Sequence, residues 1–349
     1  MLFNNRCFVY SPSDKKKSVV ALSSDAELSE IRIRPFLSAL LARDVIASFQ
    51  FADRKMNLLG CLKTARFTHV WCHRNVSYAQ YRFLKSHPNV PLIYDIDDLL
   101  TSVPEFVMKR RPNTVWRIKW CLNRADFVTT TNEQLAGDLR SGALLTKDPI
   151  ILKNGHTGFL PPVQIGLKKQ IVWTSGDFPF VLMDYPHFMN DLANIANRHD
   201  YEMIFIGRFD PECGVPFKKY RYIPRLDFDS YREFLKFSAG AIGIAPLPSR
   251  LPAAAQKFFD AKSDIKLLNY LSAGLVPICT STTPYSASDL FIPDLAAPDA
   301  SGLLDRLETC IANHASAIED VGKKNHATTG LIKREFTALS KVLDPIFQK

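Results

Sequence analysis

The feature that most constrains the fold is an alternation of short apolar strands and helical segments that runs through almost the whole chain. Near the N-terminus, a β-branched run at 18–24 precedes AELSEIRIRPFLSALLA, which has an apolar helical stripe and an expected irregularity at Pro35. Parallel strands need crossover connections, usually helices, and strands that are buried on both faces read as apolar runs. The alternation therefore predicts an α/β protein with parallel sheets covered by helices on both sides.

The alternation is interrupted at Lys153-Asn154-Gly155, where a stretch rich in glycine and proline precedes a second series. Before the break we expect strands at 18–24, 45–50, 68–74, 91–98, 126–131 and 149–154, and a helix at 54–65. After it we expect strands at 170–176, 201–208, 220–226, 239–247 and 275–282, and helices near 186–199, 229–238, 262–273 and 300–313. A chain of 349 residues is also too long for a single domain with one hydrophobic core. We predict two Rossmann-like doubly wound domains facing a cleft, at 1–153 and 154–330, and a C-terminal helix at 331–349 that could pack across both.

Composition excludes several other classes of protein. Hydrophobic residues make up 46% of the chain and charged residues 23%, values that are ordinary for a globular protein and too apolar for a disordered one. The first residues lack the apolar stretch of a signal peptide, and no apolar run approaches the roughly 18 residues of a bilayer span, so we expect a cytoplasmic protein. The seven cysteines form no CxxC pair, which disfavours a disulfide framework or a zinc site.

The net charge of +9 permits attraction to nucleic acid, anionic lipid or a phosphorylated small molecule. No zinc finger, RNA-recognition signature or basic recognition helix is visible, so nucleic acid is not an expected partner. GxGxxG after the first strand, GxxxxGK[ST] and GxSxG are also absent, which disfavours dinucleotide oxidoreductases, P-loop proteins and α/β-hydrolases.

Three carboxylates follow one predicted strand of the first half, at Asp95, Asp97 and Asp98. Ligands of doubly wound sheets bind beyond the carboxyl ends of the strands, so these groups could serve as a general base, bind sugar hydroxyls or hold a cation. The alternative is that one aspartate caps the following helix while the others face water. No second carboxylate cluster is visible, and we expect no metal.

The basic cluster Lys109, Arg110 and Arg111 follows these aspartates and would suit a phosphate or an anionic lipid, although a solvated charged loop is the simpler interpretation. His69 and His73 flank a strand end, and core or hydrogen-bonded histidines are the favoured interpretation. His156 in the linker could reach the interdomain cleft, or it could simply be exposed.

Lys262, Lys266 and Asn269 have the spacing i, i+4, i+7, which places them on one face of the helix expected at 262–273. A helix start that carries Lys262 and Ser263 can bind phosphate through backbone N–H groups and positive charge. A surface helix with solvated lysines is the alternative. Small or basic residues at preceding strand ends favour the phosphate site, namely Ser175, Gly176, Arg208 and the run Ala245-Pro246-Leu247.

Several segments, taken in order, resemble the glycosyltransferases of family 4, the retaining group with two Rossmann-like domains known as the GT-B fold. YDIDDL at 94–99 is similar to a strand end of some bacterial members, and ADFVTTTNEQL at 125–135 resembles the family's strand followed by Glu-x-Leu. The linker at 153–155 resembles the family's Pro-Asn-Gly, with lysine in place of proline. The most characteristic resemblance is the block formed by IGIAPL at 242–247, KSDIK at 262–266 and AGLVP at 273–277.

The resemblance implies that the second domain binds a nucleotide-diphosphate sugar. The donor-binding residues that we predict are Ser175, Gly176, Arg208, Lys262, Ser263, Lys266 and Asn269. The chain departs from the family at two positions, since Ala261 and Asn269 stand where two glutamates bind the sugar and the ribose. Asn269 could still form hydrogen bonds with ribose hydroxyls. The family's first glycine-rich loop is replaced by Ser23-Ser24-Asp25.

The leading hypothesis is a metal-independent, retaining glycosyltransferase that needs no cofactor beyond its nucleotide-sugar co-substrate. Asp95, Asp97 and Asp98 are its predicted catalytic residues, and Lys109, Arg110 and Arg111 its predicted contacts with a glycan or lipid-linked acceptor. Bacterial surface polysaccharide synthesis at the inner face of an anionic membrane would fit the basic charge. The alternatives are a degenerate, non-catalytic binding or scaffolding subunit, and an epimerase that acts on a nucleotide sugar.

Overall fold

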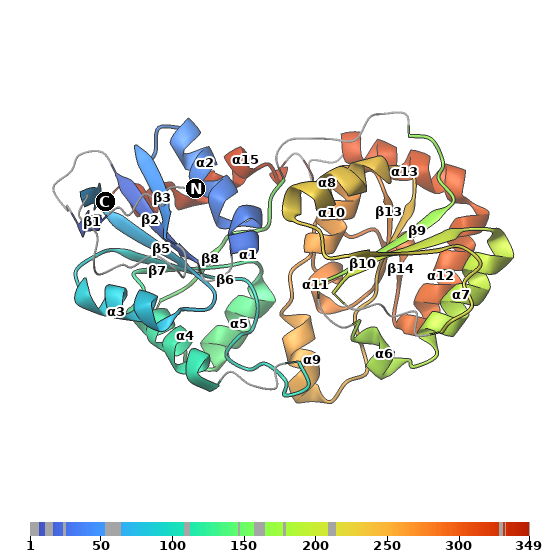
Figure 1. The fold of residues 1–349 in the computed structure, drawn as a ribbon, viewed down its shortest axis with the longest axis horizontal. Helices are drawn as coiled ribbons and strands as arrows, with labels where there is room; N and C mark the ends of the chain where they lie inside the picture. Colours follow the sequence, from blue (N-terminus) through green and yellow to red (C-terminus); the bar gives the residue numbers. More distant parts are fainter. Residues whose placement is uncertain are drawn as a thin grey trace. The chain divides into compact units, whose positions relative to one another are not determined.

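A computed structural model gives the fold of the chain (Figure 1). The structure describes residues 7–10, 17–23, 26–52, 64–107, 112–145, 147–156, 165–176, 179–208, 214–327, 331 and 333–348. The chain divides into two compact units, of which unit 1 comprises 1–155 and 336–349 and unit 2 comprises 156–335.

Unit 1 is built on a six-stranded parallel sheet with the strand order β3-β2-β5-β6-β7-β8. Its strands are β2 (Ser18–Ser23), β3 (Ser48–Ala52), β5 (His69–His73), β6 (Leu92–Ile96), β7 (Phe127–Thr130) and β8 (Ile150–Ile151). A separate parallel pair consists of β1 (Cys7–Tyr10) and β4 (Thr64–Phe67). All six strands predicted for this half lie in the main sheet. The helix expected at 54–65 falls outside the described residues, except for Thr64 and Ala65, which belong to β4.

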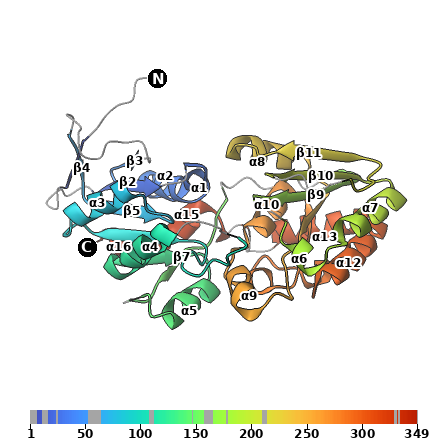
Figure 2. The same ribbon diagram turned by 60° about the horizontal axis from the view of Figure 1, so that its bottom comes forward.

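The helices of unit 1 cover both faces of its sheet (Figures 1 and 2). They are α1 (Ala26–Ile31), α2 (Ile33–Ala42), α3 (Tyr78–Ser86), α4 (Pro112–Arg124), α5 (Glu133–Ser141), α15 (Phe336–Leu339), the 3-10 helix η2 (Ser340–Leu343) and α16 (Asp344–Phe347). The helical pattern predicted around Pro35 is interrupted at Arg32, and Pro35 lies in the first turn of α2, where the missing amide hydrogen costs no helical hydrogen bond.

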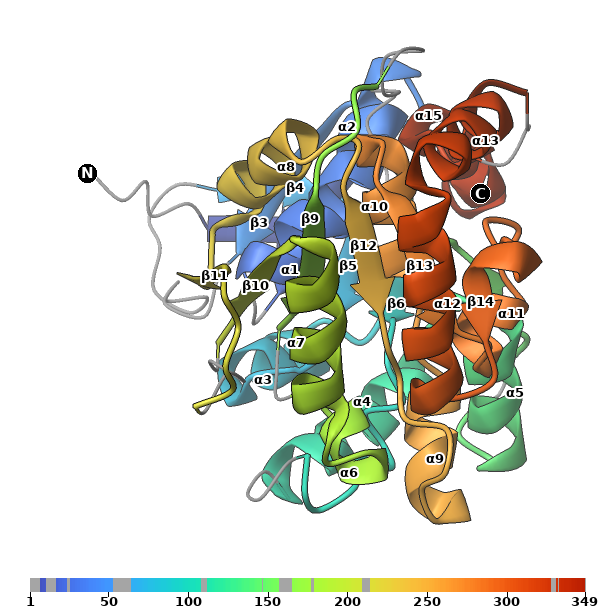
Figure 3. The ribbon, with the colours of Figure 1, turned by 90° about the vertical axis from the view of Figure 1, so that its right-hand side faces the viewer.

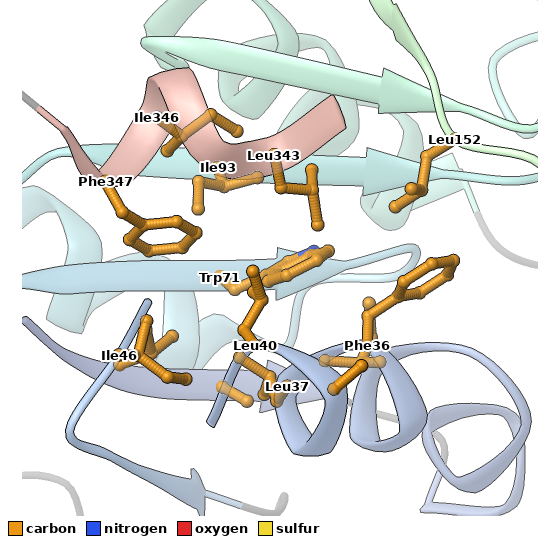
Figure 4. Close-up of a cluster of buried hydrophobic side chains, with 14 of the residues drawn as sticks. Phe36, Leu37, Leu40, Ile46, Trp71, Ile93, Leu152, Leu343, Ile346 and Phe347 are labelled. Carbon is orange, nitrogen blue, oxygen red and sulfur yellow. The ribbon is translucent and has the colours of Figure 1, made fainter. Parts of the chain in front are cut away.

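Trp71 lies at the centre of the core on one face of this sheet (Figure 4). It packs among side chains from α2, from β2 and β6, and from the C-terminal segment, including Phe36, Leu343 and Phe347. The C-terminal segment therefore completes the core of unit 1. It forms three short helices where the sequence predicted one, because Pro345 and the buried positions Leu343 and Phe347 suit short turns that follow the core.

Unit 2 contains a second six-stranded parallel sheet, with the order β11-β10-β9-β12-β13-β14. Its strands are β9 (Gln170–Ser175), β10 (Glu202–Gly207), β11 (Tyr220–Pro224), β12 (Ile242–Ala245), β13 (Val276–Thr280) and β14 (Ala296–Ala297). In chain order these strands run 3-2-1-4-5-6, the order of the dinucleotide-binding Rossmann fold. The prediction of doubly wound parallel sheets is confirmed.

The helices of unit 2 are α6 (Val181–Asp184), α7 (Phe188–His199), α8 (Phe228–Phe237), α9 (Ala253–Asp260), α10 (Ile265–Ala273), α11 (Thr283–Ser286), the 3-10 helix η1 (Pro293–Leu295), α12 (Ala300–Ala312) and α13 (His314–Ala327). Helices α7 and α12 lie against one face of the sheet, and α10 packs on the other (Figure 3). Close approach of α10 requires Gly243 in β12, because a Cβ there would lie 2.6 Å from the ring of Tyr270. Among the described residues, none of the helices has the length and apolar character that a bilayer span needs.

Candidate functional site

The carboxyl ends of the strands in unit 1 carry a buried ion pair that joins distant parts of the chain. Arg32 donates from Nε to Asp95 Oδ2 at 2.6 Å and from Nη2 to Asp95 Oδ1 at 2.8 Å. The same guanidinium reaches the carbonyl of Leu152 and the side chain of Asn154, and Thr129 donates to Asp95 at 2.5 Å. Arg32 is 2% exposed and Asp95 is fully buried. This bonding fits a positioning role for Asp95, whose catalytic role stays a prediction.

His73 lies beside this ion pair, at the end of β5. Its Nε2 is 3.6 Å from Asp95 and 3.7 Å from Asp97, and its side chain is fully buried. Both distances exceed those of hydrogen bonds, and neither ring nitrogen has a hydrogen-bond partner in the part of the chain that the structure describes. His73 therefore differs from His69, which shares a 2.8 Å hydrogen bond with Thr68 and contacts the ring of Phe347.

Asp97 and Asp98 share one guanidinium, that of Arg74. Arg74 donates to Asp97 at 2.8 Å and to Asp98 at 3.0 Å, and its backbone is held in the left-handed region with φ of 55°. Burial tends to raise the pKa of the Asp97 carboxyl, but Arg74, together with His73 and Arg32, outweighs burial and holds that pKa well below its usual range. Asp97 is therefore an ionised group at the edge of the sheet, and its side chain is 15% exposed.

Beyond this edge, α3 and α4 contact each other through an aromatic cluster that the sequence did not predict. The ring of Tyr81 lies 4.8 Å from Trp116 and 4.9 Å from Trp120, and Arg117 donates to the carbonyl of Val76. Tyr78 is 61% exposed and Trp116 is 43% exposed. Lys109, Arg110 and Arg111, the predicted acceptor contacts, lie outside the described residues.

In unit 2, the topological switch point lies between β9 and β12, where ligands of doubly wound sheets bind. Ser175 is the last residue of β9 and Gly176 follows it, and Gly176 is exposed, with no other described atom within 4 Å of the point where a Cβ would stand. The loop after β12 is held to the segment after β9, because Asp184 accepts hydrogen bonds from the backbone of Ser249 and Arg250. The loops on both sides of the switch point are therefore fixed to each other.

Lys262 lies in the loop before α10 and not on a helix. Helix α10 begins at Ile265, so the expectation that Lys262 shares a helix face with Lys266 and Asn269 is wrong, because Lys262 and Ser263 precede the helix. The Lys262 ammonium lies 4.6 Å from the ring centroid of Phe258. The neighbouring ring of Phe259 contacts Phe180, which follows β9.

These contacts join the end of α9, just before Lys262, to the segment that follows Ser175 and Gly176, and a phosphate site shared by these residues stays a prediction. Lys266 is half-buried in the first turn of α10. Arg208 is exposed directly after β10. Of the predicted donor residues, those at the carboxyl ends of β9 and β10 are Ser175, Gly176 and Arg208, those before α10 are Lys262 and Ser263, and those within α10 are Lys266 and Asn269.

Asn269 belongs to a chain of polar groups that connects α10 to β9. Its amide lies 3.4 Å from the hydroxyl of Tyr231, which lies 3.5 Å from Thr174, and Thr174 is bonded to Tyr270. Burial raises the pKa of Tyr270, so the hydroxyl keeps its proton and remains a donor. Ala261 is fully buried and offers no polar side chain. Tyr231 could have been singled out only by its place in the fold, since it lies 38 residues before Asn269 in the chain.

Comparison with known proteins identifies the fold of this chain but assigns the chain to no protein family. No protein-family model matches the chain, and no curated protein sequence matches it. Solved structures do match over nearly its whole length, and they show that the chain has the fold of the GT-B glycosyltransferases. The prediction of this fold is confirmed.

Three of the matching structures illustrate the range of proteins with this fold. Sucrose-phosphate synthase from Thermosynechococcus elongatus is 13% identical, with a TM-score of 0.64, over 95% of this chain and 98% of that one. Anabaena HepE in complex with UDP and glucose is 10% identical, with a TM-score of 0.60, over 95% and 99%. A Listeria monocytogenes protein described as a UDP-N-acetylglucosamine 2-epimerase is 12% identical, with a TM-score of 0.55, over 93% and 94%.

Proposed function

We propose that this protein is a glycosyltransferase that binds a nucleoside-diphosphate sugar in unit 2 and transfers the sugar to a hydroxyl acceptor bound by unit 1. The observation that carries the proposal is that Ser175 and Gly176 lie at the switch point of a Rossmann-type sheet, and that the segment which leads through Lys262 into α10 contacts the segment after β9, through Phe259 and Phe180. Helix-start amides and a lysine bind phosphate oxygens and stabilise the charge that develops on a departing diphosphate. Two of the solved structures with the same fold are complexes with UDP, which supports a nucleotide-sugar donor.

Asp97 is our candidate for the group that binds or activates the acceptor. It is ionised and partly exposed at the carboxyl edge of unit 1, whereas the oxygens of Asp95 are occupied by Arg32 and Thr129. Among the described residues, no cluster of histidine, cysteine and carboxylate side chains is arranged to hold a metal ion. In this proposal, the diphosphate is bound by lysine and backbone amide groups. Independence of a metal ion and retention of the anomeric configuration remain predictions.

The surface formed by α3 and α4 supports an acceptor that is carried by an anionic membrane. Tyr78, Tyr81, Trp116 and Trp120 gather there, with the exposed cations Arg82, Lys85 and Lys119 around them. Neither helix contains an aspartate or a glutamate. Aromatic side chains with surrounding cations suit the interface of an anionic bilayer. We propose peripheral contact of this surface with the inner face of the cell membrane, where a lipid-linked glycan could be the acceptor.

Sedimentation with vesicles tests the membrane contact. The protein should bind vesicles that contain phosphatidylglycerol, bind neutral phosphatidylcholine vesicles weakly, and lose binding as salt is raised. Trp116→Ser should reduce binding, whereas Phe237→Ser, which removes a 75% exposed aromatic side chain from α8 in unit 2, should not. Equal loss in both variants, or no binding to anionic vesicles, would contradict the contact.

Nucleotide binding tests the donor site. The purified protein should melt at a higher temperature with one of UDP, GDP, CMP or dTDP, without a magnesium requirement, because a ligand of the native state stabilises it by mass action. Lys262→Ala should weaken that binding by about 1.5–3 kcal/mol, the value of a charged hydrogen bond. Lys169→Ala is the control, since Lys169 is exposed at the opposite edge of the same sheet. Unchanged affinity in Lys262→Ala would remove Lys262 from the site.

A non-catalytic, nucleotide-binding subunit is the second candidate function. Buried Ala261 and the engagement of Asn269 with Tyr231 favour it, because neither position offers a carboxylate to the donor. Release of free nucleoside diphosphate from the sugar conjugate separates the two functions. An enzyme releases it when an acceptor is supplied, whereas a binding subunit retains the conjugate intact.

A further inference from the structure

Arg334 is a buried arginine near the point where the chain leaves unit 2. Unit 2 ends at Glu335, and the backbone of this segment is fixed on His156, the first residue of the unit. The amide of His156 donates to the carbonyl of Arg334 at 2.9 Å, and the His156 ring donates from Nε2 to the carbonyl of Leu331 at 2.6 Å. His156 also forms a parallel bridge with Glu335. The position of Arg334 is therefore set by the two ends of unit 2.

The Arg334 guanidinium holds the carboxylate that stands directly before α10. It donates from Nη2 to Asp264 Oδ2 at 2.7 Å, and it also pairs with Asp289. Ser288 donates to the same oxygen of Asp264. Asp264 occupies the N-cap position of α10, yet among the described residues its side chain accepts no capping hydrogen bond from the first turn. Its carboxylate is directed to Arg334 and Ser288.

This arrangement matters for an anion that binds at the start of α10. An N-terminal carboxylate stabilises a helix, but it also repels a phosphate that binds the same amides. Burial tends to lower the pKa of Arg334, but Asp264 and Asp289 outweigh burial and raise it, so the guanidinium stays charged. Arg334 is 2% exposed and Asp264 is 11% exposed, so solvent screens their interaction only weakly.

We propose that Arg334 is a positioning residue for the diphosphate site, acting through Asp264. It neutralises the Asp264 carboxylate and keeps it off the first amides of α10, so that these amides and Lys262 present a positive site to a nucleoside diphosphate. The inference rests on the proposed function and adds to it a residue that does not touch the ligand. It predicts that loss of Arg334 harms phosphate binding and leaves binding of the nucleoside part intact.

The test measures binding of the diphosphate selected from UDP, GDP and dTDP by calorimetry, and of its parent nucleoside by ligand-observed NMR. Arg334→Gln should weaken diphosphate binding about tenfold or more, since it exposes the anion to an uncompensated carboxylate. Nucleoside binding should stay within about twofold. Asp264→Asn should bind the diphosphate at least as tightly as the wild type, and Arg334→Gln/Asp264→Asn should recover most of the lost affinity.

Arg43→Gln is the matched control, because Arg43 is also an arginine that pairs with an aspartate and a serine, Asp344 at 2.6 Å and Ser340 at 2.9 Å, but within unit 1. It should leave diphosphate binding unchanged. The inference is overturned if Arg334→Gln binds the diphosphate like the wild type, or if Asp264→Asn alone weakens binding about tenfold. It is also overturned if the double variant, folded by circular dichroism, stays as weak as Arg334→Gln.

The failure of this inference is distinguishable from the failure of the proposed function. If the wild type binds none of the three diphosphates, both the proposed function and the inference about Arg334 are wrong. If the wild type binds one and Lys262→Ala weakens that binding while the Arg334 variants do not, only the role of Arg334 falls. If Arg334→Gln does not fold, Asp264→Asn and Arg334→Lys decide. Asp264→Asn must bind the diphosphate at least as tightly as the wild type, and Arg334→Lys, which keeps the charge, must bind it within about threefold of the wild type.

Discussion

Replacing Arg32 with glutamine should destabilise unit 1 by about 3–5 kcal/mol, the cost of removing one partner from a buried ion pair. The magnitude follows from the contacts that are lost. Arg32 makes two bonds to Asp95, at 2.6 and 2.8 Å, one to the Leu152 carbonyl at 2.8 Å and one to Asn154 at 3.1 Å. Glutamine cannot replace them, and a fully buried carboxylate remains without its counter-charge. Against a domain stability of about 5–15 kcal/mol, this loss is large.

Denaturant unfolding of unit 1 can be followed separately from unit 2. The chain has four tryptophans, and only Trp173 lies in unit 2. In a Trp173→Phe background, the fluorescence therefore comes from Trp71, Trp116 and Trp120 of unit 1. The unfolding midpoint in urea should fall for Arg32→Gln, with little change in the slope of the transition.

Arg34→Gln is the control for Arg32→Gln, two residues further along the chain. Arg34 pairs with Glu30 on the surface, where the two side chains are 45% and 43% exposed, and its guanidinium lies 4.3 Å from the ring centroid of Phe51, so its loss should cost no more than about 1 kcal/mol. Arg32→Met/Asp95→Leu should be more stable than Arg32→Gln, because it removes both charges. A cost below about 1 kcal/mol for Arg32→Gln, or equal costs for Arg32→Gln and Arg34→Gln, would refute the buried-pair argument.

Three further predictions concern other sites. Asp97→Asn should lower the turnover of sugar transfer about tenfold or more, with donor affinity kept within about twofold, in steady-state kinetics; an unaltered rate would return Asp97 to a structural role. Gly243→Ala should lower stability by about 1–3 kcal/mol in thermal unfolding, because the new methyl group meets the Tyr270 ring at 2.6 Å, and a neutral result would mean that the ring can shift. Burial lowers the pKa of His314 from 6.5 to about 4, so as the pH falls the unfolded chain takes up the proton at a higher pH than the folded chain does. The contribution of His314 to stability is therefore fully present above pH 6.5 and is lost as the pH drops toward 4. His314→Gln should flatten this part of the profile in urea unfolding at a series of pH values, and an unchanged profile would contradict the assignment.

The sequence predicts the sheets well because their signal is local. Each main strand of unit 1 is a short apolar run, and the period of two along a strand places Asp95 and Asp97 on the same side. The partners of these aspartates are not local. Arg32 lies 63 residues before Asp95, and the link between them depends on the pairing of β2, β5 and β6 in one sheet.

The start of α10 lies three residues later than predicted, because the apolar periodicity at 262–273 does not distinguish a helix from the loop that leads into it. A stronger boundary signal is present in Asp264, a preferred N-cap residue that precedes the apolar run. Its pairing with Arg334, 70 residues later, could not be read from any local pattern. Helix α9, at Ala253–Asp260, is also not among the helices predicted from the sequence.

The charges at the two sheet edges give an argument for the assignment of donor and acceptor that does not depend on the resemblance. In unit 1, the guanidinium groups of Arg32 and Arg74 face three carboxylates among the described residues of the edge, those of Asp95, Asp97 and Asp98. Such an edge disfavours a diphosphate and suits neutral hydroxyl groups, which donate hydrogen bonds to carboxylates. In unit 2, Arg334 pairs with Asp264 and Asp289, so an anion beside Lys262 and the first amides of α10 would not face an uncompensated Asp264 carboxylate. The opposite assignment would place a diphosphate against ionised Asp97, so we expect phosphate binding to be lost with Lys262 and to be unaffected or strengthened by Asp97→Asn.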